Sequence, residues 1–279
     1  MENSINNLWA HIDILESAAP SPNGKFGSAL DIYDDKIVVG TLWENGFNGG
    51  VYIYKNDGSD NWQHIHTFAD PTSGSDQLGT SVSIYEDLVL IGAKHYNNDW
   101  IGAAFLYEYD GSSWTLVKQF EPINDPNILG EYATIFGSSV SIDGKTIVIG
   151  APSSHGTLRE EAGAAFVYTN FYNDWILEDK ILPDNLHLSN QEFGIQVKVK
   201  DDLMTIGSTG SGHSITGPGY IDVYERNSNN KWIRIDKLYS SAGLDDGLFG
   251  LSIATDGNYI ISGDHRADTS NGAAYIFKR

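Results

Sequence analysis

The chain has no cysteine, few basic residues and no long apolar run. Without cysteine it has no disulfides, thiol nucleophiles or cysteine-based zinc sites. The 17 Lys and Arg against 37 Asp and Glu give a net charge of −20. This charge argues against nucleic acid or an anionic membrane as partner, because both require clustered Lys and Arg. No stretch approaches the ~20 apolar residues of a membrane helix, so no membrane insertion is expected.

The composition favours an all-β protein. The 279 residues include 30 glycines, 15 tyrosines, 11 phenylalanines and 7 tryptophans, and few stretches have helical periodicity. A chain of this length buries enough surface to fold without a disulfide or a metal. The N-terminal stretch MENSINNLWAHIDILES lacks the basic region and apolar core of a signal peptide. The N-terminal residues therefore do not indicate a cellular compartment.

One pattern of two short apolar stretches around a turn occurs five times. Its clearest copy is FGSSVSIDGKTIVIGAP, which starts at Phe136. The spacing from the first to the last glycine is the same in every copy: Gly27 to Gly40, Gly79 to Gly92, Gly137 to Gly150, Gly194 to Gly207, and Gly250 to Gly263. A fixed length with alternating apolar positions indicates a β-hairpin whose turn does not vary. On its first strand we expect one apolar face, such as Val140 and Ile142, and one small or polar face.

Two further strands follow each hairpin. The third begins at Gly49, Gly102, Gly163, Gly219 and Gly272, as in GAAFVY. In four copies a tryptophan then opens a fourth strand: Trp62, Trp114, Trp175 and Trp232. The fifth copy ends at Arg279 before that strand, whereas NLWAHIDILE places Trp9 as far before Phe26 as Trp232 lies before Phe249. The N-terminal strand is thus predicted to complete the last sheet.

Repeats of 52 to 58 residues with four strands each indicate a circular array. We predict one domain, a five-bladed β-propeller of four-stranded antiparallel blades over residues 1–279, closed by the N-terminal strand. The approximate blades are 26–77, 78–135, 136–192, 193–248, and 249–279 with 1–25. The pattern FG…V.I…..IVIGAP……GAAFVY resembles the FG-GAP repeat, which forms the blades of the integrin α-subunit propeller and of many bacterial and other surface proteins. This resemblance implies a binding or adhesion role at a surface or outside the cell.

Many FG-GAP blades hold calcium in the turn between their first two strands. Calcium takes six to eight oxygen ligands, so such a turn is long and rich in carboxylates. Here the turns are tight and carry at most two carboxylates, as in Asp143-Gly144-Lys145. His64 and His66 are expected to share one face of an outer strand, where solvated histidines, and not a zinc pair, are the default. We predict no metal site and no cofactor.

The loops of variable length all fall on one face of the predicted disk, because the second turn of a blade and the link to the next blade lie on the same side. Recognition usually sits on variable loops held by a rigid scaffold. Two of the seven tryptophans and several other aromatic residues lie in these loops, and such side chains are enriched at binding sites. The candidate ligand-binding residues are Trp43, Phe47, His95, Tyr96, Trp100, His155, His213 and His265.

Three functions are compatible with this face. The favoured one is a non-enzymatic recognition module for a protein or glycan. The alternative is a lectin with one or two aromatic sugar sites, at Trp43 and Trp100, although equivalent sites in every blade would require similar loops. A glycosidase requires two carboxylates at a set separation, and the first strands offer Asp31 but no convergent acidic set. No G-x-S-x-G or phosphate-binding loop is present, so no catalytic residue is predicted.

Overall fold

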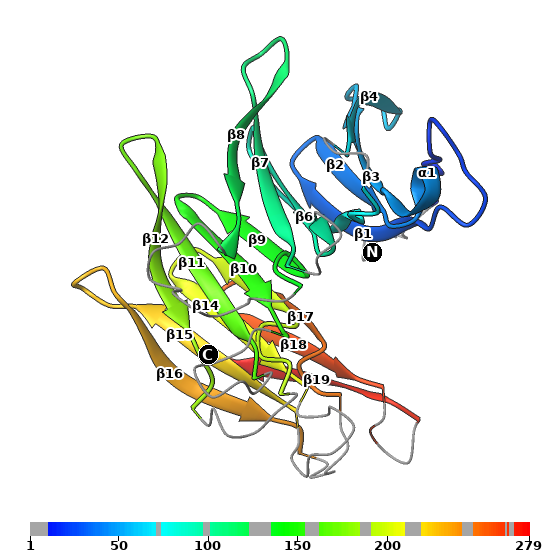
Figure 1. The fold of residues 1–279 in the computed structure, drawn as a ribbon. Helices are drawn as coiled ribbons and strands as arrows, with labels where there is room; N and C mark the ends of the chain where they lie inside the picture. Colours follow the sequence, from blue (N-terminus) through cyan, green and yellow to red (C-terminus); the bar gives the residue numbers. More distant parts are fainter. Residues whose placement is uncertain are drawn as a thin grey trace, which may run out of the picture.

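The computed structural model describes residues 11–70, 74–96, 101–122, 135–153, 162–184, 191–209, 219–241, 248–265, 267 and 271–279. In this part of the chain, nineteen strands form five separate antiparallel sheets, arranged as the blades of a propeller (Figure 1). The all-β fold and the five blades are therefore confirmed. The described helix α1 (Glu44–Phe47) is far too short and polar to cross a membrane.

Each sheet follows the order of the chain, with its first strand at one edge. The first blade contains β1 (Phe26–Tyr33), β2 (Lys36–Thr41), β3 (Gly50–Asn56) and β4 (Trp62–Ala69). The second contains β5 (Leu78–Tyr85), β6 (Leu88–Ala93), β7 (Ala103–Tyr109) and β8 (Trp114–Phe120). The third contains β9 (Ser139–Asp143), β10 (Thr146–Ala151), β11 (Ala164–Phe171) and β12 (Asp174–Ile181). The fourth contains β13 (Val197–Lys200), β14 (Leu203–Ser208), β15 (Tyr220–Arg226) and β16 (Trp232–Tyr239), and the fifth β17 (Ser252–Thr255), β18 (Tyr259–Asp264) and β19 (Ala273–Lys278).

The first hairpin of the blades has the tight turn that the constant spacing predicts. In the first blade Tyr33 pairs with Lys36, which leaves only Asp34 and Asp35 in the turn. Asp34 has a φ of 52°, and a positive φ at the first turn residue matches the right-handed twist of the strands. Glu86 and Asp201, with φ of 53° and 52°, occupy the same position in the second and fourth blades. A longer turn would change this register, which explains why its length is constant.

The hydrophobic core lies between neighbouring sheets. Val82 and Ile84 on β5 are 5% and 3% exposed and pack against Val38 and Ile53 of the first blade. Val140 and Ile142 on β9 are buried in the same way, so the predicted apolar face is confirmed in the second and third blades. The first blade differs, because Leu30 and Ile32 on β1 are 64% and 62% exposed.

Three repeat tryptophans belong to core clusters that two neighbouring blades form together. Trp114 shares its cluster with Ile53 and Phe68 of the first blade, Trp175 with Leu106 and Phe120 of the second, and Trp232 with Val167 and Ile181 of the third. Burying an indole between blades ties adjacent sheets together, as expected of packing residues.

The fifth sheet has three strands within the described residues, whereas the other four sheets have four. The expected closing strand begins at Trp9, which lies outside the described part, and residues 11–17 form no strand. Leu15 nevertheless packs in a cluster with Ile37, Tyr54 and Trp62 of the first blade. Ring closure therefore stays a prediction.

Candidate functional site

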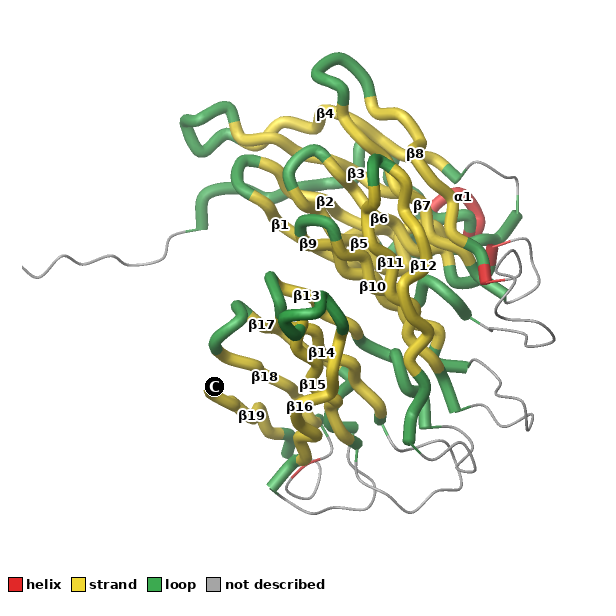
Figure 2. Tube along the Cα trace, turned by 90° about the vertical axis from the view of Figure 1, so that its left-hand side faces the viewer, coloured by secondary structure: helices red, strands yellow, loops and turns green. Residues whose placement is uncertain are grey.

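Antiparallel pairing places the end of each second strand, where the second turn begins, at the opposite end of the sheet from the tight first turn. Helix α1, in the second turn of the first blade, lies at the opposite end of its sheet from the β1–β2 turn (Figure 2). Five of the eight predicted residues are described: Trp43, Phe47, His95, Tyr96 and His265. Trp100, His155 and His213 lie outside the described residues.

Trp43 and Phe47 contact each other in the loop between β2 and β3. Their rings meet edge to face, with centroids 5.5 Å apart, and the ammonium of Lys25 lies 3.2 Å from the centre of a Trp43 ring. Cation–π contacts of this kind are favourable and hold the indole in place. One face of Trp43 is therefore covered by Lys25, whereas Phe47 is 50% exposed.

The backbone holds Phe47 in a conformation that L-residues rarely adopt. Phe47 has a φ of 79°, and the preceding Asn45 and Gly46 also have positive φ, so α1 is not a regular helix. The carbonyl of Phe47 accepts a hydrogen bond from the N–H of Gln77, in the link to the second blade. A bulky side chain at positive φ costs roughly 1–3 kcal/mol and such residues cluster at functional sites.

The second blade places Lys94, His95 and Tyr96 after β6. The ring of Tyr96 packs at 5.3 Å, edge to face, on Phe105 of β7, so Tyr96 lies against its own blade. The N–H of His95 donates a hydrogen bond to the carbonyl of Asp76. Burial, then the charge of Lys94, lowers the pKa of His95, whereas Asp76 opposes this shift.

Two lysines, one from each of the first two blades, interact electrostatically on this face. Burial lowers the pKa of Lys94, and the charge of Lys25 lowers it further. Lys25 and Lys94 therefore lie within electrostatic range of each other, although they come from different blades. We name Lys25, Trp43, Phe47 and Lys94 the blade one–two patch. The chain has 17 basic residues and a net charge of −20, so a local pair of cations differs in sign from most of its charged groups.

A cavity of about 410 Å³, which Lys25 helps to line, lies between the N-terminal link and the first blade. Glu44, only 2% exposed, accepts hydrogen bonds from the hydroxyls of Ser17 (2.7 Å) and Tyr52 (2.6 Å). Burial, then the hydrogen bond to Glu44, raises the pKa of the Tyr52 phenol. Glu44 thus fixes the start of α1 to both the sheet and the link, which positions Trp43 beside it.

Sequence reasoning missed Lys25, Lys94 and Glu44. Lysines and glutamates in loops are ordinarily solvated, so their residue type alone does not indicate a binding site. The scarcity of cations in this chain was the one sign that singled out Lys25 and Lys94. His265, by contrast, is exposed after β18 in the fifth blade and is not part of the blade one–two patch.

His64 and His66 do not share a face of β4, contrary to the alternation assumed from sequence. A register shift between Ile53 and Tyr54 of β3 places Ile53 opposite His66 and Tyr54 opposite His64. His64 then packs on Tyr54, and His66 packs on Phe68 and towards the second blade. Among the described residues, no group of three or more His, Asp or Glu side chains is placed to hold a metal ion.

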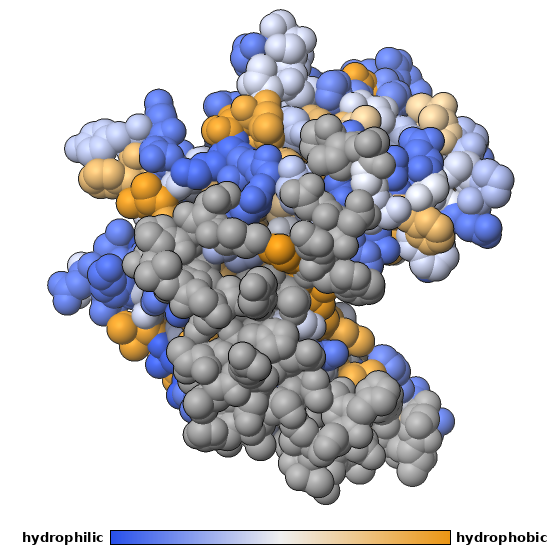
Figure 3. Space-filling view, in the orientation of Figure 1, coloured by the Kyte–Doolittle hydropathy of each residue, from blue (hydrophilic) through white to orange (hydrophobic). Residues whose placement is uncertain are grey.

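Hydrophobic residues are dispersed on the face that Figure 3 shows, where they form separate spots among hydrophilic ones. Many exposed apolar residues belong to outer strands, for example Ile65, Leu116 and Ile233. Singly exposed apolar residues are normal and need no partner. Exposed hydrophobicity alone therefore does not mark a binding site here.

The comparison with protein families identifies the repeat. The family model of the FG-GAP repeat matches residues 131–168, which reach β11 of the third blade, and residues 232–277, which run from β16 to β19. The matched stretches of the chain thus carry FG-GAP repeats, and the structure is a five-bladed propeller. No curated protein matches the chain significantly.

Proposed function

We propose that this protein is a non-enzymatic recognition module that binds a macromolecular partner, most directly a protein, through the blade one–two patch on its variable face. An FG-GAP propeller suggests a binding or adhesion role as a class. The observation that carries the proposal for this chain is Phe47, half exposed at a φ of 79° beside an indole that is already covered.

Packing alone does not explain an exposed aromatic residue in a strained backbone conformation, because the strain exceeds the stabilisation that a half-exposed ring gains. A half-exposed ring gains little hydrophobic stabilisation, and a positive φ adds strain of roughly 1–3 kcal/mol. Phe47 is held by its neighbours rather than by a core. This is the arrangement of a preorganised contact residue, since rigid aromatic side chains bind at low entropic cost.

The charges of the patch define the chemistry of the partner. Neither Lys25 nor Lys94 forms an ion pair within the described residues, and their like charges repel. An acidic group on a partner would relieve this repulsion. The remaining surface of a chain with net charge −20 repels acidic partners, so the patch would orient such a partner on this face.

A lectin site at Trp43 is less favourable. A pyranose stacks on an open aromatic face, and Lys25 lies over one face of this indole. A glycosidase is also disfavoured, because the carboxylate of Asp31 already accepts hydrogen bonds from Ser83 and from the N–H groups of Ile32 and Ile84. Asp31 therefore serves to join blades, not to activate a substrate.

Two matched variants test the proposal. Phe47→Asn removes the exposed ring of the patch, and Asn tolerates a positive φ. Tyr172→Asn removes a 90% exposed ring at a φ of 50° on the opposite, uniform face. Proteins captured from the native source by the wild type should be identified and their affinity measured with both variants and with Lys94→Glu.

We expect Phe47→Asn and Lys94→Glu to weaken binding at least tenfold, because an aromatic or cationic anchor contributes about 2 kcal/mol or more. Tyr172→Asn should bind as the wild type does. Unchanged affinity in both patch variants would overturn the proposal. A glycan-array signal that both patch variants lose, with no protein partner captured, would establish the lectin alternative.

A further inference from the structure

The cavity between the N-terminal link and the first blade has the size and the lining of a site for a small ligand. Its volume of about 410 Å³ falls within the ~300–1,000 Å³ of typical ligand pockets. Apolar and polar side chains both line it: Leu15, Pro20, Phe26, Ser17, Ser21 and Glu44. A ligand in this cavity would therefore meet an apolar wall and a few polar groups, which is the usual composition of such sites.

The carboxylate of Glu44 is buried at the wall of this cavity without a cation beside it. Glu44 is 2% exposed, and its two oxygens accept hydrogen bonds from the hydroxyls of Ser17 and Tyr52. Two accepted bonds and no donated bond are the pattern of an ionised carboxylate. Neither hydroxyl carries a charge, and within the described ranges Glu44 forms no ion pair. A buried charge without an opposite charge is unfavourable.

Two other carboxylates show how this protein treats a charge that it removes from water. Asp222 is fully buried, and the ammonium of Lys237 lies 3.3 Å from one of its oxygens. Glu178 is largely buried, and the guanidinium of Arg226 lies 2.8 Å from its carboxylate. Glu44 differs from both, because its charge is balanced by no side chain of the described residues and borders a cavity instead.

The nearby lysine does not fill this role. Lys25 also lines the cavity, but its ammonium lies over a ring of Trp43, 3.2 Å from the ring centre. Ser21 is a second lining residue with an unmet polar group, because its buried hydroxyl oxygen has no hydrogen-bond partner in the described part of the chain. The cavity thus borders two polar side chains whose requirements the surrounding residues do not meet.

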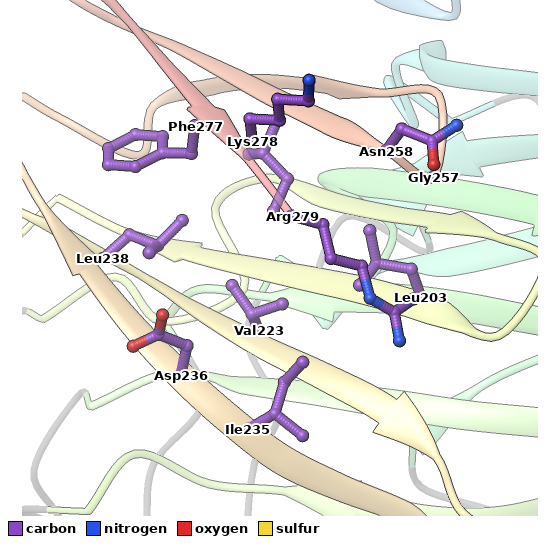
Figure 4. A pocket seen from close by; sticks show the side chains of 11 residues that line it. Leu203, Val223, Ile235, Asp236, Leu238, Gly257, Asn258, Phe277, Lys278 and Arg279 are labelled. Atoms are coloured by element: carbon purple, nitrogen blue, oxygen red, sulfur yellow. The ribbon is translucent and has the colours of Figure 1, made fainter.

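The cleft between the fourth and fifth blades has a different chemistry (Figure 4). It measures about 110 Å³, and Leu203, Val223 and Phe277 form part of its apolar wall. Its charged side chains are exposed to solvent, and Arg279 is already paired with Glu225. This cleft contains no buried charge that would select a ligand, so the selective site is the cavity at Glu44.

We propose that the cavity beside the first blade binds a small organic ammonium compound, with the charged nitrogen against Glu44 and the hydrocarbon part against Leu15 and Phe26. The ammonium group supplies the opposite charge that the buried carboxylate lacks. A compound with a single positive charge suits the site best, because Lys25 at the same cavity repels a second one. This binding site is separate from the proposed recognition function and requires no macromolecular partner.

Three probes of similar shape and different charge test the proposal: n-butylammonium, n-butanol and butyrate. Their affinities can be measured by ligand-observed NMR in ~0.15 M NaCl, which screens the general attraction of cations to a chain of net charge −20. We expect saturable binding of n-butylammonium, about tenfold or more weaker binding of n-butanol, and no binding of butyrate. Equal binding of n-butylammonium and n-butanol would overturn the proposal.

A matched pair of variants assigns the charge that is recognised. Glu44→Gln removes the buried charge and keeps the shape of the side chain, whereas Glu108→Gln makes the same change at an exposed position of β7. We expect Glu44→Gln to weaken n-butylammonium about tenfold or more and Glu108→Gln to leave its affinity unchanged. Equal effects of the two variants would overturn the assignment to Glu44 and indicate attraction to the net charge of the chain.

A measurement on the unmodified protein locates the ligand even if Glu44→Gln does not fold. Nuclear Overhauser effects between the butyl protons and the ring of Phe26 are expected, because this ring lines the cavity. Saturable binding of n-butylammonium without these effects would place the ligand elsewhere and overturn the proposed site.

Discussion

The carboxylate of Asp31 in the first blade accepts a hydrogen bond from the backbone N–H of Ile84 in the second, at 2.8 Å. The next blades repeat this contact with serine. The hydroxyl oxygen of Ser83 accepts the N–H of Ile142, and that of Ser141 accepts the N–H of Val199. One side chain on each of these three innermost strands thus satisfies a backbone donor of the next blade, which fixes the spacing between neighbouring sheets.

Asp31→Ala should destabilise the protein by about 1–3 kcal/mol, because the N–H of Ile84 and the hydroxyl of Ser83 would lose their acceptor. Denaturant unfolding of the variant measures this change. Asp60→Asn, in an exposed turn at a φ of 60°, is the control and should leave the midpoint unchanged. An Asp31→Ala midpoint equal to that of the wild type would refute the role given to this carboxylate.

Gly150→Ala should destabilise the protein by about 2 kcal/mol or more. A Cβ at Gly150 would lie 2.0 Å from the carbonyl oxygen of Gly194 in the next blade, and backbone has little room to move. Gly58→Asn, in an open turn with nothing within 4 Å, should have little effect because Asn tolerates the positive φ. Thermal unfolding compares the two variants, and a smaller loss in Gly150→Ala than in Gly58→Asn would contradict the close approach of the blades.

Tyr54→Phe should make stability less sensitive to high pH. Burial, then the charges of Tyr52 and Glu44, raises the pKa of Tyr54 from 10.0 to about 12. The folded state therefore favours the neutral phenol. Its contribution to stability is fully present below pH 10 and is lost as the pH rises through 12.

Denaturant unfolding from pH 7 to above pH 11 measures this effect. At pH 7 we expect Tyr54→Phe to be less stable by about 1 kcal/mol, because the hydroxyl of Tyr54 donates a hydrogen bond to the carbonyl of Glu16. Above pH 10 the stability of the wild type should fall more steeply than that of the variant. Parallel curves would show that Tyr54 does not contribute, and Tyr172→Phe, at an exposed site, is the control.

Phe47→Asn should fold with a free energy of unfolding within about 1 kcal/mol of the wild type. Relief of strain at a φ of 79° offsets the lost edge contact with Trp43. Truncation of a core aromatic residue costs about 3–5 kcal/mol, and Phe105→Ala on the buried β7 provides that comparison. A loss in Phe47→Asn as large as in Phe105→Ala would assign Phe47 to packing and remove the basis of the proposed patch.

Much of the fold was predictable because the repeat is local in sequence. The constant separation of Gly137 and Gly150 predicts a tight hairpin, and its two-residue turn is observed in the register of β9 and β10. The tryptophans that open the fourth strands were predicted to pack, and Trp175 is buried. Hydrogen bonds between residues close in sequence, and the alternation of apolar and polar residues, determine these features. They can therefore be predicted without knowledge of tertiary contacts.

The candidate site was less predictable, because its contacts join segments that are distant in sequence. An aromatic residue in a polar loop has the same sequence signature whether it faces solvent or packs. Tyr96 lies on Phe105, Trp43 is covered by Lys25, and Phe47 remains half exposed. Only the positions of the neighbouring loops determine whether such an aromatic side chain is packed, covered or exposed.

The amino-acid sequence by itself determined the five repeats, their strands and their tight turns. It also showed that Trp9 occupies the same repeat position as the other repeat tryptophans. Each of these features depends only on spacing along the chain. Tertiary structure decided which loop residues meet and which apolar surfaces stay uncovered. Lys25 approaches Lys94, and Leu15 joins Trp62, because two blades bring them together in space. Burial and electrostatic range are properties of that packing, and no single repeat contains them.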